Sequence, residues 1–89
     1  MIDASLNLEL KHAIVRALRL PIDPTDIGDD TPLFGEGLGL DSIDVLELVL
    51  ELERSFGVQI QDEQTGMDVL QSINTIAVFV QRQRANDIV

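Results

Sequence analysis

Side chains that could carry covalent chemistry are few in this chain. Its 89 residues include no Cys and no Tyr, and His12 is the only histidine. Disulfides and thiolate–metal sites are therefore excluded. Ser42 lies far from His12 in the sequence, and Leu40 and Asp44 stand where the G-x-S-x-G pattern of a hydrolase needs its glycines. Because a nucleophile needs a base and oxyanion donors, we expect a protein that is not an enzyme and has no catalytic residue.

Glycines and aspartates precede Ser42, but they fit no cofactor or metal motif. Gly35 and Gly37 alternate, yet Leu40 occupies the third glycine position of the dinucleotide-binding pattern G-x-G-x-x-G. The aspartates of residues 23–30 fit no register of the calcium-binding EF-hand loop. We therefore expect no nucleotide site and no metal site.

Apolar residues at helical spacing predict an all-α fold. We expect a small bundle of three main helices plus a short one, with a long ordered loop between helices 1 and 2. The first helix is expected at about residues 4–18, with Asp3 or Ser5 as its cap and Pro21 as its stop. The loop, residues 21–41, is expected to pack on the core through its apolar side chains: Ile27, Leu33, Phe34, Leu38 and Leu40.

The second helix is expected at residues 42–55. Asp41 and Asp44 at its start resemble a capping box, and Gly57 follows as a terminator. The segment that follows, VQI, is too short for a strand and is expected to be a connector.

The C-terminal third predicts two further elements. A short helical turn is expected near residues 62–70 and a last helix from about Asn74, whose side chain suits a cap, to Arg82. Residues 1–89 then form one domain, because the length leaves no room for a second.

Two apolar stripes run along the second helix. At 100° per residue, one stripe forms an arc that suits the core: Val45, Leu48, Val49, Leu52 and Phe56. Ile43, Leu46 and Leu50 form a second stripe, bordered by Glu47 and Glu51. An apolar strip edged by acids predicts a docking surface for basic partners, and a helix buried on two sides is the alternative.

The charge is strongly acidic, at −10 from 16 acids and six bases. Between Leu20 and Gln81 there are thirteen acids and a single base, Arg54. Nucleic acids and anionic membranes require clustered Lys and Arg, so we expect neither as a partner. No apolar run approaches the ~18 residues of a membrane span, and the N-terminus lacks the layout of a signal peptide. We expect a cytoplasmic monomer.

The run GLGLDSIDVLEL at residues 37–48 resembles the prosthetic-group site of acyl carrier proteins, where D-S-[LI] opens the second helix after a long loop. The resemblance covers most of the chain, with T-P-L-F at 31–34, G-L-D-S-I-D at 39–44, F-G at 56–57 and an apolar last helix. The D-S-I element becomes a specific indication of this family when it is combined with the length of the chain, its acidity and the position of the loop.

This resemblance implies that a phosphopantetheinyl transferase attaches 4′-phosphopantetheine covalently to Ser42, with Asp41 in the transferase's recognition element. Acyl intermediates of fatty-acid, polyketide or related biosynthesis would be carried as thioesters on the cofactor thiol. The other partners would be acyl-loading and acyl-processing enzymes with basic docking surfaces. The residues expected to contact them are Ile43, Asp44, Leu46, Glu47, Leu50 and Glu51.

The same assignment predicts how the prosthetic group and its cargo are accommodated. Unpaired amides and the positive dipole end at the first turn of the helix would stabilise the phosphodiester. Aliphatic cargo would fold back between helices in the space left by small residues, Ala13, Ala17 and Ala77. The glycine-rich segment GEGLG, residues 35–39, favours a specialised stand-alone carrier. The alternatives are an aminoacyl or peptidyl carrier and an unmodified acidic helical adaptor, which needs no accessible Ser42.

Overall fold

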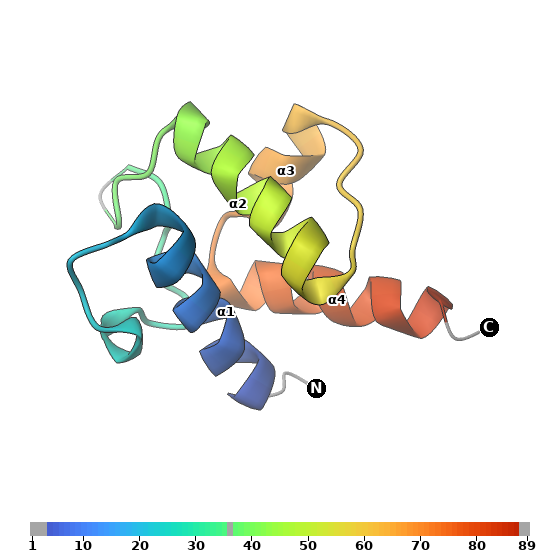
Figure 1. The fold of residues 1–89 in the computed structure, drawn as a ribbon, viewed down its shortest axis with the longest axis horizontal. Coiled ribbons are helices and arrows are strands. Elements are labelled where there is room, and N and C mark those ends of the chain that lie inside the picture. The colour runs from blue at the N-terminus through green and yellow to red at the C-terminus, as the bar shows by residue number, and fades with distance from the viewer. Residues whose placement is uncertain (1–3, 36, 88–89) are drawn as a thin grey trace.

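Three helices of 15 residues and a shorter one of seven make up the computed structural model, which describes residues 4–35 and 37–87 (Figure 1). The elements are α1 (Ala4–Leu18), the 3₁₀ turn η1 (Pro24–Asp26), α2 (Ser42–Phe56), α3 (Glu63–Val69) and α4 (Ile73–Asp87). Among the described residues there is no strand, only an isolated bridge between Phe34 and Leu40. The expected bundle of three main helices and a short one is confirmed.

Helix α1 has the expected bounds but ends in a way that the sequence did not indicate. Arg19 adopts a left-handed conformation with φ of 51°. The Leu20 N–H then donates to the Val15 carbonyl at 3.1 Å, the bond that closes a Schellman motif. The helix is therefore finished before the proline that was expected to stop it. Of the two expected caps, Asp3 lies outside the described residues and Ser5 lies within α1.

The core forms where α2 and α4 pack on α1. The expected inner stripe of α2 is buried, except that Val49 is half-buried. Gly57 ends the helix in a left-handed conformation, as expected. The innermost side chains come from all three long helices: Leu10, Ile14, Leu48, Leu52, Ile76 and Val80.

The long loop between α1 and α2 is attached to the α3–α4 junction. The Leu33 N–H donates to the Gln71 carbonyl, and the Asn74 N–H donates to the Asp29 carbonyl, both at 3.0 Å. Its apolar side chains enter the core as expected, some fully and some half-buried: Ile27, Leu33, Leu40, Phe34 and Leu38. The loop therefore brings the start of α2 to a defined position.

The expected cap at Asn74 is wrong, because α4 begins one residue earlier and extends beyond its expected end. Ser72 and Thr75 form the start: the Ser72 N–H donates to Thr75 Oγ1 at 2.9 Å and the Thr75 N–H donates to Ser72 Oγ at 3.3 Å. The Asn74 amide instead accepts from Asn7 Nδ2 at 3.1 Å and donates to the Asp30 carboxylate. The Asn74 side chain therefore makes a tertiary contact between α1, the loop and α4 and does not cap the helix.

Candidate attachment site at the start of α2

Ser42 is the first residue of α2, and it is exposed. Asp41 precedes it as the N-cap, and its Oδ1 accepts from the backbone N–H groups of Ile43 and Asp44, both at 3.0 Å. Asp44 Oδ2 accepts from the Asp41 N–H at 3.0 Å. This is the expected capping box. It holds the Ser42 backbone in a fixed turn while the residue faces solvent.

The capping box changes the expected electrostatics of the site. The amides of Ile43 and Asp44 are both occupied by Asp41, so the expectation of unpaired amides is wrong for these two groups. The Asp41 carboxylate also adds negative charge beside Ser42. The two amides therefore have no free N–H to donate to a phosphodiester, and only the helix dipole remains to stabilise it. The negative charge of Asp41 favours a phosphodiester that projects away from the helix into solvent.

A close turn of the loop leads into this site. A Cβ on Gly37 would lie 1.6 Å from the Pro32 carbonyl oxygen, which accepts from the Leu38 N–H at 3.1 Å. The Leu40 N–H donates to the Leu33 carbonyl at 3.0 Å just before the helix begins. The backbone therefore folds against itself at a distance that only glycine allows.

Three apolar side chains of α2 are exposed on its outer face. Ile43 is 71% exposed, Leu46 62% and Leu50 55%. This confirms the second stripe as an exposed surface and excludes the helix buried on two sides. Glu47 is exposed beside the stripe. We call Ile43, Leu46, Glu47 and Leu50 the outer face of α2. Contiguous exposed apolar side chains of this kind mark interaction sites.

The expected position of Glu51 at the edge of this face is wrong, because the residue is only 4% exposed. Arg16 Nη2 on α1 lies 2.8 Å from Glu51 Oε2, and Arg54 Nη2 lies 2.6 Å from Oε1. The Ser55 hydroxyl donates to Oε2 at 2.6 Å. The hydrogen bond from Ser55, followed by that from Arg16, lowers the Glu51 pKa to about 2. The carboxylate is a link within the bundle and is not available to a partner.

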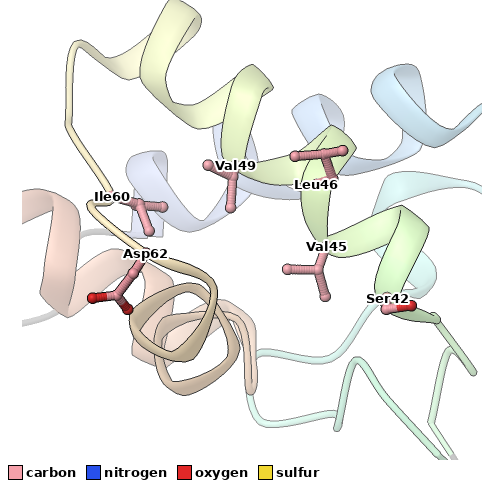
Figure 2. A pocket seen from close by; sticks show the side chains of 6 residues that line it. All are labelled: Ser42, Val45, Leu46, Val49, Ile60 and Asp62. Atoms are coloured by element: carbon pink, nitrogen blue, oxygen red, sulfur yellow. The ribbon is translucent and has the colours of Figure 1, made fainter.

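A pocket of about 390 Å³ opens beside Ser42, between α2 and the connector to α3. Figure 2 shows Val45 and Val49 of α2 pointing towards Ile60 and Asp62, with Ser42 at the N-terminal end of the same helix. The residues that line it are Ser42, Val45, Leu46, Val49, Ile60 and Asp62. Most of this lining is aliphatic, so the pocket suits an aliphatic group held close to Ser42.

The expected space between helices at the small residues is not the space of this pocket, and where an acyl chain lies stays a prediction. Ala13, Ala17 and Ala77 are not among the residues that line the pocket, and Ala13 and Ala77 are fully packed in the core. The pocket lies between α2 and the connector that leads to α3. The expected short helix is confirmed as α3, and its N-cap is Asp62, whose Oδ1 accepts from the Thr65 N–H at 2.7 Å.

The comparison with known proteins agrees with this geometry. Residues 9–81 match the family model described as "Phosphopantetheine attachment site". The chain belongs to the acyl carrier protein family. The acyl carrier protein of Thermosynechococcus vestitus is 43% identical over 72 residues, which cover 75% of this chain and 86% of that protein. The acyl carrier protein of Wolinella succinogenes is 36% identical over 72 residues, which cover 75% of this chain and 91% of that protein.

Family membership confirms the resemblance that the DSI run indicated, and it identifies 4′-phosphopantetheine as the prosthetic group of the domain. Among the residues singled out from the sequence, Asp41, Ser42, Ile43 and Asp44 lie together in the first turn of α2. Leu46, Glu47 and Leu50 continue along its exposed side. Sequence reasoning missed the pocket because Ile60 and Asp62 reach it only through the path of the connector.

In the part of the chain that the structure describes, no group of three or more His, Cys, Asp or Glu side chains is arranged to hold a metal ion. No described helix is long and apolar enough to span a membrane.

Proposed function

We propose that this protein is an acyl carrier whose Ser42 hydroxyl accepts 4′-phosphopantetheine from coenzyme A. The observation that carries the proposal is the exposed serine at the capped first residue of α2, inside the segment that matches the attachment-site family. A hydroxyl in that position is within reach of another enzyme's active site. The acyl carrier role of the family relatives then applies to this chain.

The residues present fit the prosthetic group. When bound, 4′-phosphopantetheine supplies the thiol on which acyl groups are held as thioesters. Asp41 and Asp44 hold the turn that presents Ser42 and take no part in chemistry. The aliphatic pocket beside Ser42 accommodates the tail of a cargo chain and excludes water from it. Its apolar lining favours an acyl carrier over an aminoacyl or peptidyl carrier.

The outer face of α2 is proposed as the docking surface for partner enzymes. Its three apolar side chains lie exposed beside Ser42, and Glu47 supplies a charge that attracts a basic surface. The expected partners are the phosphopantetheinyl transferase and acyl-loading and acyl-processing enzymes. Asp41 and Asp44 lie next to this face, whereas Glu51 is left out of it. A cytoplasmic, monomeric carrier in fatty-acid, polyketide or related biosynthesis stays our prediction.

Intact mass measurement tests the attachment. The purified protein is incubated with coenzyme A and a broad-specificity phosphopantetheinyl transferase, and we expect a mass gain of one phosphopantetheine group. Ser42→Ala should remain folded by circular dichroism but gain no mass, since a first-turn serine contributes no more than ~1 kcal/mol to the helix. Ser5→Ala, a change at an exposed serine of α1, is the matched control and should be modified normally. An unmodified wild type would favour the adaptor alternative, and modification of Ser42→Ala would refute the assigned residue.

A further inference from the structure

Gly66, in the middle of α3, is buried. It is not itself among the residues that line the pocket beside Ser42, but it packs against side chains that are. A Cβ at this position would lie 3.3 Å from Val49 Cγ2, 3.6 Å from Ile60 Cγ2 and 3.7 Å from Val45 Cγ1. All three of these side chains line the pocket. The α3 backbone therefore packs against three apolar side chains of the pocket wall without a side chain of its own.

The backbone conformation does not require glycine at this position. Gly66 is helical and is not among the glycines with positive φ. Its N–H donates to the Asp62 carbonyl at 3.0 Å, and its carbonyl accepts from the Leu70 N–H at 2.9 Å. Glycine is less favourable than alanine inside a helix. The distinctive property of Gly66 is thus the space that it leaves.

The connector wall of the pocket is held in place from two sides. The Ile60 N–H donates to Glu53 Oε2 of α2 at 3.1 Å. The Gln83 side chain of α4 pairs with the backbone of Gln59, accepting from its N–H at 2.9 Å and donating to its carbonyl at 2.6 Å. Because these bonds restrain the connector, the pocket cannot easily widen there to compensate for a loss of space on the α3 side.

We infer that Gly66 determines the length of aliphatic chain that the pocket accepts, an inference that rests on the proposed carrier function. A methyl group at this position would press on Val49 at 3.3 Å, which is tighter than ordinary van der Waals contact. Val49 has to shift, and a shift away from α3 takes its side chain into the pocket. The pocket then becomes shallower, and the distal carbons of a long chain stay in water.

The experiment compares acyl chains of increasing length on the full-length protein. Wild type, Gly66→Ala and the control Gln64→Ala are loaded by the transferase from acyl-coenzyme A donors with even carbon numbers. Gln64 lies on α3 and is exposed, so its replacement alters the same helix without entering the pocket. The melting temperature and the rate of thioester cleavage by hydroxylamine are measured for each chain length. Burial of the acyl chain raises the melting temperature and lowers the rate of thioester cleavage.

We expect the wild type and Gln64→Ala to gain melting temperature with chain length up to the same limit. Gly66→Ala should be folded and loaded normally, but its gain should stop about two carbons earlier, because close-packed interiors respond to single methylene groups. Its long-chain thioesters should react faster with hydroxylamine. Adding Val49→Ala removes the side chain nearest to the new methyl group, and the double variant should recover the longer limit.

The outcomes separate this inference from the proposal on which it rests. If the wild type gains no mass with the transferase, the carrier function itself fails. If the wild type is loaded but shows no dependence on chain length, the cargo pocket and the role of Gly66 both fail. If the wild type shows the dependence and Gly66→Ala follows the same curve, only the role of Gly66 is refuted.

Discussion

The Arg16 guanidinium of α1 and the Glu51 carboxylate of α2 meet at 2.8 Å across 35 positions of sequence. Glu51 is buried, whereas the side chains of Arg16 and Arg54 are 66% and 78% exposed. One carboxylate is therefore removed from solvent and compensated by two cations at its rim and by the Ser55 hydroxyl. This link joins the first helix to the helix that presents Ser42.

Glu51→Gln should lower the free energy of unfolding by about 1–3 kcal/mol at pH 7, a range that allows for solvent screening of the exposed arginines. The Glu51 pKa is lowered from 4.5 to about 2 in the folded state. A carboxyl group with a lowered folded-state pKa stabilises the protein above its unfolded pKa, and this contribution disappears as the pH falls through the folded pKa. The difference between wild type and variant should thus shrink to less than about half by pH 3.

Urea unfolding of the two proteins at pH 7, 5 and 3 measures this difference. Glu9→Gln, a neutralisation of an exposed acid on α1, is the control for the change in net charge. An equal difference between wild type and Glu51→Gln at all three pH values would contradict the ion-pair explanation.

Glu47→Lys should slow the transferase reaction by about three- to tenfold at low salt, because charges at the rim of an interface act mainly on the association rate. The wild-type rate should fall with added salt, and the variant should be much less sensitive. Its stability should be unchanged, since Glu47 is exposed. Glu9→Lys makes the same charge change on α1. Equal rates for wild type and a folded Glu47→Lys would mean that the acid belongs to an ordinary solvated surface.

Ile43→Ala should weaken the same interaction in a different way. Ile43 is an apolar anchor next to Ser42 and is 71% exposed, so its truncation removes contact area without opening the core. We expect reduced affinity for the transferase at low and high salt alike. Transferase kinetics at two ionic strengths compare it with Glu47→Lys, and a defect that vanished at high salt would argue against an apolar contact.

Two substitutions at Asp41 separate its capping role from recognition by the transferase. Asp41→Ala removes the acceptor for two amides and should destabilise the protein by about 1 kcal/mol. Asp41→Asn keeps a capping oxygen, so its stability should stay within a few tenths of a kcal/mol of wild type. If the transferase recognises the carboxylate, Asp41→Asn should nevertheless be modified more slowly. Thermal melting and modification rates are measured on both variants, and a normal rate for Asp41→Asn would leave Asp41 with the capping role alone.

Gly37→Ala should destabilise the loop that positions Ser42 more than Gly35→Ala does. The new Cβ on Gly37 would lie 1.6 Å from a backbone oxygen of Pro32, so the turn must open, at a cost of about 2–4 kcal/mol. Gly35 has open space around it but a φ of 66°, for which an L residue costs about 1–2 kcal/mol. Chemical denaturation of both variants gives the comparison. The reverse order would show that conformational freedom matters more here than close approach.

Local rules were sufficient for much of this protein. The bounds of α1, the capping box of Asp41 and Asp44, and the left-handed Gly57 all depend on residues within one turn of one another. The two apolar stripes of α2 follow from helical geometry in the same way. The DSI run indicated the family, which the match over residues 9–81 confirms. It also predicts Ser42 as the attachment residue.

Tertiary structure decided the features that depend on distant partners. Glu51 sits at the edge of an apolar stripe in the sequence, but Arg16, 35 positions earlier on α1, stabilises it in the interior. Asn74 has the side chain of a cap and is used instead to join α1 and the loop. The pocket lies where the connector passes α2, since the volume between elements depends on how they pack and not on the size of individual residues. Desolvation and ion pairing depend on groups that are close in space, so the pattern of apolar and acidic residues along one helix does not predict them.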